Sequence, residues 1–207
     1  GSGHEEILGQ FAKKERIIIG TTEDNGAVLG LGHVRRGGSG KTNVGMLCED
    51  REAFLPRLKE SFDACGFSVH IYGNIQQLIW DKLFINSSLS AVTGILQVKM
   101  GYISADEHAW NLCCALIHEA AEAARALGLC AEEEEIREKV RRTSLRSPEG
   151  ITSIYADLRD GRRTEVDTIS GSVVRAAQRL GIEVPCQRFV VDMIHAMEER
   201  GCQAGSL

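Results

Sequence analysis

The pattern of apolar and polar positions changes near residue 74 and divides the chain into two parts. Before that point, short apolar runs predict strands, and two of these runs predict the arms of a hairpin that turns at Gly32-His33. Helical periodicity predicts two helices in the same part. The predicted strands span 15–22, 27–31, 34–36, 42–47 and 67–72, and the predicted helices span 5–12 and 51–65.

After residue 74 the periodicity is helical. From Ala105 to Leu127 the apolar residues fall on one stripe, and Gly128 follows as a glycine typical of a helix C-terminus. Pro185 suits the first turn of the last helix. The fold class predicted is α/β plus all-α, with a small sheet in residues 1–74 and a helical domain in 75–207. Further helices are predicted over 131–142, 152–159, 163–180 and 185–200.

One helix after residue 74 carries a polar stripe in an otherwise apolar sequence. Lys82, Asn86, Ser90 and Thr93 follow one another at intervals of four, four and three, which places them on one face of a regular helix. The apolar residues around them predict that this helix is largely buried. A buried ammonium and carboxamide need partners, so the stripe is expected to line a ligand-binding cleft. The alternative is that the lysine reaches water and the asparagine binds nearby backbone.

A second polar group runs from Thr152 to Asp167, around a predicted helix, a glycine turn and the start of another helix. Thr164 suits an N-cap, and Glu165 and Asp167 then lie in the first helical turn, where the helix dipole favours carboxylates. A place as a helix-start acid is a sufficient role for Asp167. For Glu165, capping and a role in a binding site are equally compatible with the sequence.

Composition narrows the classes of function. With 43% hydrophobic and 26% charged residues and a formal net charge of −5, the chain is typical of a soluble globular protein without a nucleic-acid or anionic membrane partner. It contains no apolar run of roughly 18 residues, and no signal-peptide pattern, so membrane insertion and export are not expected. Its seven cysteines lack disulfide or zinc-site spacing, which indicates a cytoplasmic protein without a metal site.

Two other motifs do not predict a site. Gly40-Lys41-Thr42 is similar to the end of a phosphate-binding loop, but Arg35 stands where that loop needs glycine, and Thr42 begins a predicted strand. The charged run 132–142 predicts a solvated helix face with ion pairs from Glu135 to Lys139 and from Glu138 to Arg142.

Together these residues resemble the ketopantoate reductase (2-dehydropantoate 2-reductase) family. The resemblance rests on Trp80, Lys82, Leu83, Asn86 and the small residues up to Thr93, then on Thr152-Ser153 and 161–167, with Gly171, Gly181-Ile182 and Pro185 beyond them. Glycines of the first part are similar to late strands of that family. The resemblance implies NADPH-dependent reduction of 2-dehydropantoate to pantoate, a step towards pantothenate and coenzyme A, in a cleft between a Rossmann domain and a helical domain.

The resemblance also implies roles for single residues. Lys82 is similar to the catalytic lysine, Glu165 to the acid that engages the substrate, and Asn86 and Ser153 to substrate-binding residues. An ammonium can stabilise the negative charge that hydride addition creates on the carbonyl oxygen, and it can deliver a proton. Ser90 stands where family members often carry a second asparagine, so its substrate contact is expected to be altered, and the exact 2-oxo acid stays open.

The chain lacks the strand-linked glycine fingerprint G-x-G-x-x-G of a dinucleotide site. Residues 1–74 are therefore expected to be the truncated C-terminal part of a dinucleotide-binding domain, and the chain a fragment that neither binds NADPH well nor turns over substrate. An unpaired sheet edge would then be available to a second copy in a homodimer. Two alternatives remain: a noncatalytic helical binding or assembly module, and a reductase for a related 2-oxo acid.

Overall fold

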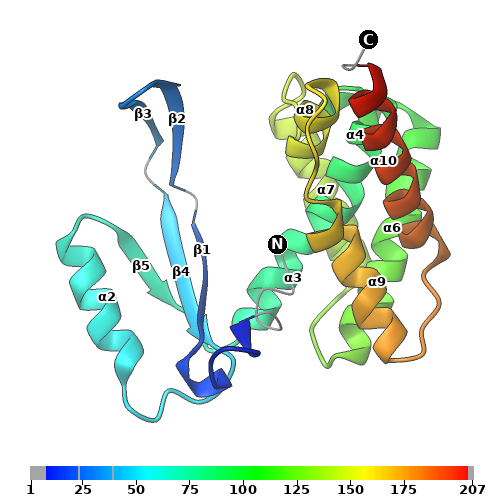
Figure 1. Cartoon of the computed structure of the whole chain (residues 1–207). Helices are drawn as coiled ribbons and strands as arrows, with labels where there is room; N and C mark the ends of the chain where they lie inside the picture. Colours follow the sequence, from blue (N-terminus) through cyan, green and yellow to red (C-terminus); the bar gives the residue numbers. More distant parts are fainter. Residues whose placement is uncertain (1–7, 23, 39, 205–207) are drawn as a thin grey trace. The chain divides into compact units, whose positions relative to one another are not determined.

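The computed structural model describes residues 8–22, 24–38 and 40–204 (Figure 1). Contacts divide the chain between Ile79 and Trp80 into a first unit and a helical unit. This division falls inside helix α3 (Ile75–Ile85), whereas the sequence pattern changes at residue 74. The combination of a small sheet followed by helices agrees with the predicted fold class.

The first unit is built on a three-stranded sheet of order β1-β4-β5. Strand β1 (Ile18–Thr22) pairs antiparallel with β4 (Lys41–Met46), from Ile18 opposite Met46 to Thr22 opposite Thr42. Strand β5 (Ser68–Ile71) pairs parallel with β4, and helix α2 (Phe54–Ala64) connects the two. Strand, helix and parallel strand form a βαβ unit, the building block of Rossmann-type sheets. A short helical turn, η1 (Lys14–Arg16), precedes β1, so the strand predicted over 15–22 begins only at Ile18.

The core of the first unit lies between α2 and one face of this sheet. Leu55 of α2 packs with Val44 of β4 and Val69 of β5, and all three are buried. Gly45 permits the chain to approach closely here, because a Cβ at that position would lie 2.8 Å from the carbonyl oxygen of Tyr72 and 2.7 Å from Cβ of Ile75.

The predicted hairpin is confirmed, with a shifted turn. Strands β2 (Asn25–Gly30) and β3 (His33–Gly38) pair antiparallel, and the turn lies at Leu31-Gly32 rather than Gly32-His33. Gly32 has a φ of +70°, a left-handed conformation that glycine adopts without strain. Of the helix predicted over 5–12, residues 5–7 lie outside the described residues, and 9–12 form turns and a bend instead of a helix; the helix predicted over 51–65 begins later, at Phe54.

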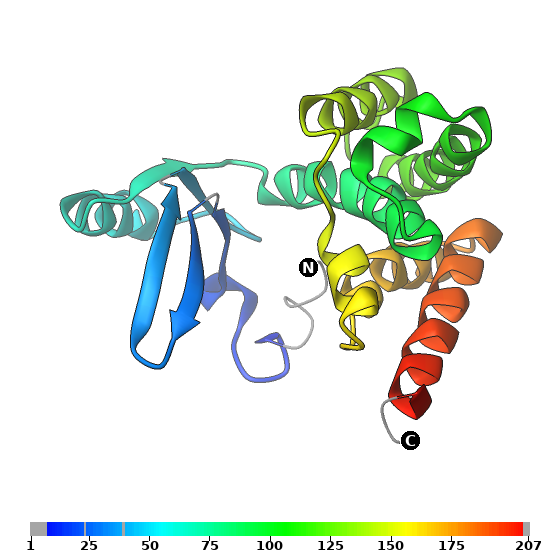
Figure 2. The ribbon, with the colours of Figure 1, turned by 90° about the horizontal axis from the view of Figure 1, so that it is seen from above.

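Helices make up the unit that begins at Trp80, and Figure 2 shows them from a second direction. They surround α6, whose buried face is rich in alanine, and small side chains let neighbouring helices approach closely. No helix in the described part of the chain is both long and apolar enough to cross a bilayer. The elements are α3, the π-helical turn η2 (Asn86–Ser90), α4 (Ala91–Leu96), α5 (Met100–Ala105), α6 (Glu107–Ala126), α7 (Glu133–Arg146), α8 (Ser153–Arg159), η3 (Val166–Thr168), α9 (Ser170–Arg179) and α10 (Pro185–Ala204).

A buried carboxylate ties α6 to the start of α10. The two oxygens of Glu119 accept hydrogen bonds from the backbone N–H groups of Cys186 and Gln187, each at 2.8 Å. The amide of Gln187 donates in return to the carbonyl oxygen of Leu116 at 3.1 Å. The first N–H groups of a helix have no partner within it, so a carboxylate placed there satisfies both its own charge and the helix end.

Two local predictions are wrong. The helix predicted over 163–180 is divided, because the backbone of Ile169 (φ −105°, ψ −95°) leaves the helical region between η3 and α9. The ion pairs predicted along α7 are also different: Arg137 pairs with Glu133, and Lys139 reaches Asp81 of α3 at 3.5 Å. Helical spacing indicates which side chains are neighbours, but packing against other helices decides which of them pair.

Candidate functional site

The helix that carries the polar stripe is not regular. The turn Asn86–Ser90 is π-helical, and within it the hydroxyl of Ser88 donates to the carbonyl oxygen of Phe84 at 2.6 Å. A π turn takes in one additional residue, which rotates the residues on its two sides relative to each other. Such turns are frequent at functional sites.

The π turn separates the stripe into a part near solvent and a buried part. Lys82 is exposed and Asn86 is half-buried, whereas Ser90 and Thr93 are buried. The expectation that Lys82 is buried is therefore wrong, because its side chain is exposed. Among the described residues, no ion pair is formed by Lys82.

The buried end of the stripe is joined to the start of α8 by a chain of hydrogen bonds. The hydroxyl of Thr93 donates to the carbonyl oxygen of Leu89 at 2.8 Å, and its oxygen lies 2.8 Å from the hydroxyl of Thr152. Because the single hydroxyl proton of Thr93 goes to the carbonyl, Thr152 is the donor between the two threonines. Thr152 also accepts from the N–H of Tyr155, as the N-cap of α8.

Close packing of α4 on α8 places Ser153 beside this polar group. A Cβ added to Gly94 would lie 2.4 Å from Cγ2 of Ile154, so only glycine fits between the two helices without movement. Ser153, between Thr152 and Ile154, is the first residue of α8 and is exposed. The structure thus joins the buried end of the stripe to the segment that contains Ser153.

Glu165 lies in the irregular segment between α8 and η3. Its side chain is exposed and, although it occupies the N-cap position of η3, it makes no capping hydrogen bond. Thr164, predicted as a helix N-cap, instead accepts from the N–H of Val166 at 3.1 Å, in a local turn before η3. The structure therefore removes the capping role considered for Glu165.

Asp167 lies in the first turn of η3, as predicted for a helix-start acid, and its side chain also reaches α10. Its Oδ1 lies 3.1 Å from Nε2 of His195 on α10, and Nδ1 of the same imidazole lies 3.1 Å from Oε2 of Glu198. The other oxygen of Glu198, Oε1, accepts from the backbone N–H of Thr164 at 2.7 Å. The carboxylate of Glu198 is buried, so its charge needs these donors.

These contacts change the pKa values of His195 and Glu198. The hydrogen bond to Glu198 raises the pKa of His195 above its ordinary value of 6.5, and Asp167 adds to this against the opposing effect of burial. Burial by itself would raise the pKa of Glu198, but hydrogen bonds from Thr164 and His195 outweigh it and lower the pKa.

The comparison with known proteins identifies the family. A family model described as ketopantoate reductase PanE/ApbA C terminal matches residues 74–198. The chain belongs to the ketopantoate reductase family. This membership confirms the resemblance drawn from the stripe and from the segment around Glu165.

This member of the ketopantoate reductase family is only distantly similar in sequence to individual relatives. The 2-dehydropantoate 2-reductase of Streptococcus pyogenes serotype M6 is 27% identical over 199 residues, covering 96% of this chain and 65% of that protein. The same enzyme of Archaeoglobus fulgidus is 27% identical over 198 residues, covering 96% and 66%. The structure of D-mandelate dehydrogenase with NADH and anilino(oxo)acetate has a TM-score of 0.86 at 26% identity, covering 97% of this chain and 66% of that one. The chain thus spans 65% to 66% of the length of these curated relatives.

Sequence reasoning missed three polar residues of the helical unit. Glu119, His195 and Glu198 lie on helices where spacing alone predicts surface charges, yet Glu119 and Glu198 are buried. Their partners are N–H groups and side chains distant in the sequence. A glutamate on the alanine-rich buried face of α6 is the one signal that the sequence offers, because a buried charge requires a partner.

Other reactive groups of the chain are not arranged as a site. Burial raises the pKa of the thiols of Cys113 and Cys114, so neither is an activated thiolate. Within the described residues, no group of three or more histidines, cysteines or acids is placed to hold a metal ion.

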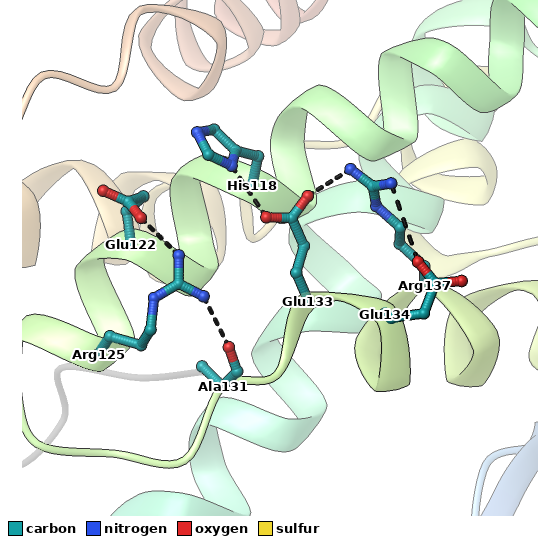
Figure 3. Close-up of polar contacts among 7 residues, drawn as sticks. All are labelled: His118, Glu122, Arg125, Ala131, Glu133, Glu134 and Arg137. Atoms are coloured by element: carbon teal, nitrogen blue, oxygen red, sulfur yellow. Dashed lines mark hydrogen bonds and ion pairs between the residues drawn. The ribbon is translucent and has the colours of Figure 1, made fainter.

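A separate polar cluster on α6 and α7 stabilises the turn between these helices (Figure 3). Nδ1 of His118 lies 2.9 Å from Oε2 of Glu133, which also pairs with Arg137. Arg125 binds Glu122 and the carbonyl oxygen of Ala131. The His118–Glu133 contact connects α6 with α7, and the Arg125–Ala131 contact connects α6 with the segment before α7, whereas the other pairs lie within one helix; all of them are structural.

Proposed function

We propose that this chain supplies the substrate-binding residues of an NADPH-dependent 2-dehydropantoate 2-reductase. Membership of the ketopantoate reductase family supports this proposal. The observation that carries it is the environment of Lys82, an exposed ammonium that forms no ion pair among the described residues and lies one helical turn before half-buried Asn86. A cation left without a protein partner is available to an anionic substrate.

The chemistry of the proposed reaction fits these groups. When a hydride adds to the ketone carbon of a 2-oxo acid, negative charge develops on the carbonyl oxygen, and Lys82 would stabilise that charge and donate a proton to it. The amide of Asn86 and the hydroxyl of Ser153 can bind carboxylate and hydroxyl oxygens of the substrate. Glu165, which caps no helix, would accept a hydrogen bond from a substrate hydroxyl.

The described βαβ unit does not fit a dinucleotide. The pyrophosphate of NADPH would bind to free N–H groups at a helix N-terminus. At the start of α2 the carboxylate of Asp50 already accepts from the N–H groups of Phe54 and Leu55, each at 2.8 Å, and Glu49 and Glu52 add negative charge nearby. We infer that the hydride donor is held by residues outside this βαβ unit, and that the 207-residue chain alone reduces no substrate.

A binding measurement on the chain tests the proposal. Calorimetry with 2-dehydropantoate should detect binding to the unmodified chain, and Lys82→Ala should weaken it by about tenfold or more, as expected for the loss of a charged hydrogen bond. Lys99→Ala is the matched control, because Lys99 is an exposed lysine of the same unit that pairs with Glu149. Equal affinities of the Lys82→Ala and Lys99→Ala variants would refute the role of Lys82.

A reductase for another 2-oxo acid is the second candidate. Two observations favour it: Ser90 stands at a position where the family resemblance implies a second asparagine, and a structure of D-mandelate dehydrogenase with an oxo acid ligand is similar to this chain. Serine offers one donor instead of two. Tighter binding of 2-oxo-2-phenylacetate than of 2-dehydropantoate would favour this candidate, and we expect Ser90→Asn to shift the preference towards 2-dehydropantoate. Absence of binding to both would favour a noncatalytic module.

A further inference from the structure

The segment that carries Glu165 is held to α10 on both sides of that residue. On one side, the backbone N–H of Thr164 donates to Oε1 of Glu198 at 2.7 Å. On the other side, Oδ1 of Asp167 lies 3.1 Å from Nε2 of His195. His195 and Glu198 are one helical turn apart and bind each other at 3.1 Å. The four residues therefore form a continuous chain of hydrogen bonds around Glu165.

Proton counting assigns a charge to the imidazole in this arrangement. Both ring nitrogens of His195 face carboxylate oxygens, and an ionised carboxylate can only accept a hydrogen bond. Both nitrogens must therefore carry a proton, so His195 is an imidazolium when both contacts are made. A neutral imidazole has one N–H and can serve only one of the two carboxylates.

The surroundings of His195 are mainly acidic. Asp167 of η3 and Glu198 of α10 face the imidazole directly. From α9, Arg175 adds a cation near this group: its Nη1 lies 3.3 Å, and Oδ1 of Asp167 lies 3.7 Å, from the position that a Cβ on Gly171 would occupy. The other neighbouring helices add little: α4 has no charged residue, the carboxylate of Glu119 on α6 binds the opposite end of α10, and Arg159, Asp160 and Arg162 after α8 pair with one another.

We propose that His195 and Glu198 position Glu165, and that they hold its loop firmly only while His195 is protonated. This inference rests on the proposed function, in which Glu165 contacts the substrate. Deprotonation would release Asp167 rather than Glu198, because the Asp167 side chain is 67% exposed and can exchange the imidazole for water, whereas that of Glu198 is 6% exposed. The raised pKa of His195 extends the protonated state above the ordinary range of a histidine.

Hydrogen exchange tests the positioning without any ligand. His195→Gln keeps a side-chain NH2 that can bind one carboxylate, but it is neutral at every pH, so it should accelerate exchange of amides in residues 161–169 by about tenfold near pH 6, the effect of one charged hydrogen bond. At a pH about two units above the pKa of His195, the unmodified chain should exchange as fast as the variant. His118→Gln is the matched control, because His118 also binds a carboxylate but on α6 (Figure 3). Equal protection in all three proteins near pH 6, or a difference that persists at high pH, would overturn the proposal.

Nitrogen NMR of the unmodified chain gives an independent readout. Near pH 6, the His195 ring should show two protonated nitrogens, and its titration should be accompanied by shifts of the Thr164 and Asp167 amides. A neutral tautomer at that pH would overturn the proposal even if the His195→Gln variant did not fold.

Ligand binding separates failure of this inference from failure of the proposed function. If both are right, His195→Gln weakens 2-dehydropantoate binding by about tenfold near pH 6, and the difference from the unmodified chain disappears as pH rises. If the unmodified chain binds no 2-dehydropantoate at any pH, the proposed function fails, and the exchange data alone still decide whether His195 holds the loop.

Discussion

Replacement of Glu119 by alanine offers the sharpest test of how the helical unit is held together. The two hydrogen bonds from Glu119 to the N–H groups of Cys186 and Gln187 each involve a charged acceptor and contribute roughly 1.5–3 kcal/mol. Their loss would cost about 3–6 kcal/mol, and water that reaches half-buried Cys186 would recover part of it. We expect a net destabilisation of about 3 kcal/mol, or roughly 6–12 °C in Tm for a unit of this size.

Tryptophan fluorescence during urea unfolding measures this effect on the helical unit alone. The chain has two tryptophans, Trp80 and Trp110, and both belong to that unit. Glu122→Gln is the control, because Glu122 lies on the same helix at the surface, where it pairs with Arg125. The destabilisation by Glu119→Gln should lie between those of Glu119→Ala and Glu122→Gln, since an amide keeps one acceptor oxygen. A loss below about 1 kcal/mol for Glu119→Ala, or one equal to that of Glu122→Gln, would refute the reasoning.

Two further predictions concern the same unit. Gly94→Ala should destabilise it by about 1–3 kcal/mol, because the new Cβ would lie 2.4 Å from Cγ2 of buried Ile154. In urea unfolding, the double variant Gly94→Ala/Ile154→Ala should lose less stability than the sum of the losses in the two single variants. Strictly additive losses would contradict the contact between residues 94 and 154. The stability contributed by His195 should be complete below its unfolded pKa near 6.5 and should be lost as pH rises through its higher folded value. Unfolding midpoints across that range should therefore fall more in the unmodified chain than in His195→Gln, and parallel curves would contradict this.

Much of the fold could be predicted from the sequence because its signals are local. The hairpin, the strands 42–47 and 67–72, and the long helix ending before Gly128 appear within a residue or two of their predicted bounds. The split of the predicted helix 163–180 was missed although Thr168, Ser170 and Gly171 around Ile169 are weak helix formers, because low propensity alone does not locate a break in a helix. Packing of the segment between α8 and α9 on α10 decides that conformation.

The candidate site was predictable in part for the same reason. The stripe from Lys82 to Thr93 is visible as spacing along one helix, but the π turn within it is not, and so the expected burial of Lys82 was wrong. Asp167 does lie in a first helical turn, but its contact with His195 was not predictable, because α10 is far along the chain. Convergence of Lys82, Asn86, Ser90, Ser153 and Glu165 on one substrate stays a prediction, as does pairing of the outer sheet edge with a second copy.

The π turn also has a consequence for how such a chain evolves. An additional residue in a helix is most simply acquired as a single-codon insertion, and each residue of an α-helix corresponds to a rotation of about 100°. Deleting one residue between Asn86 and Ser90 would restore a regular helix and turn Thr93 away from Thr152, although every side chain type in the stripe could be kept. The relative orientation of the two halves of the stripe thus depends on how many residues separate them rather than on which residues those are. Insertions and deletions at this point, more than substitutions, would be the events that create or abolish such a site.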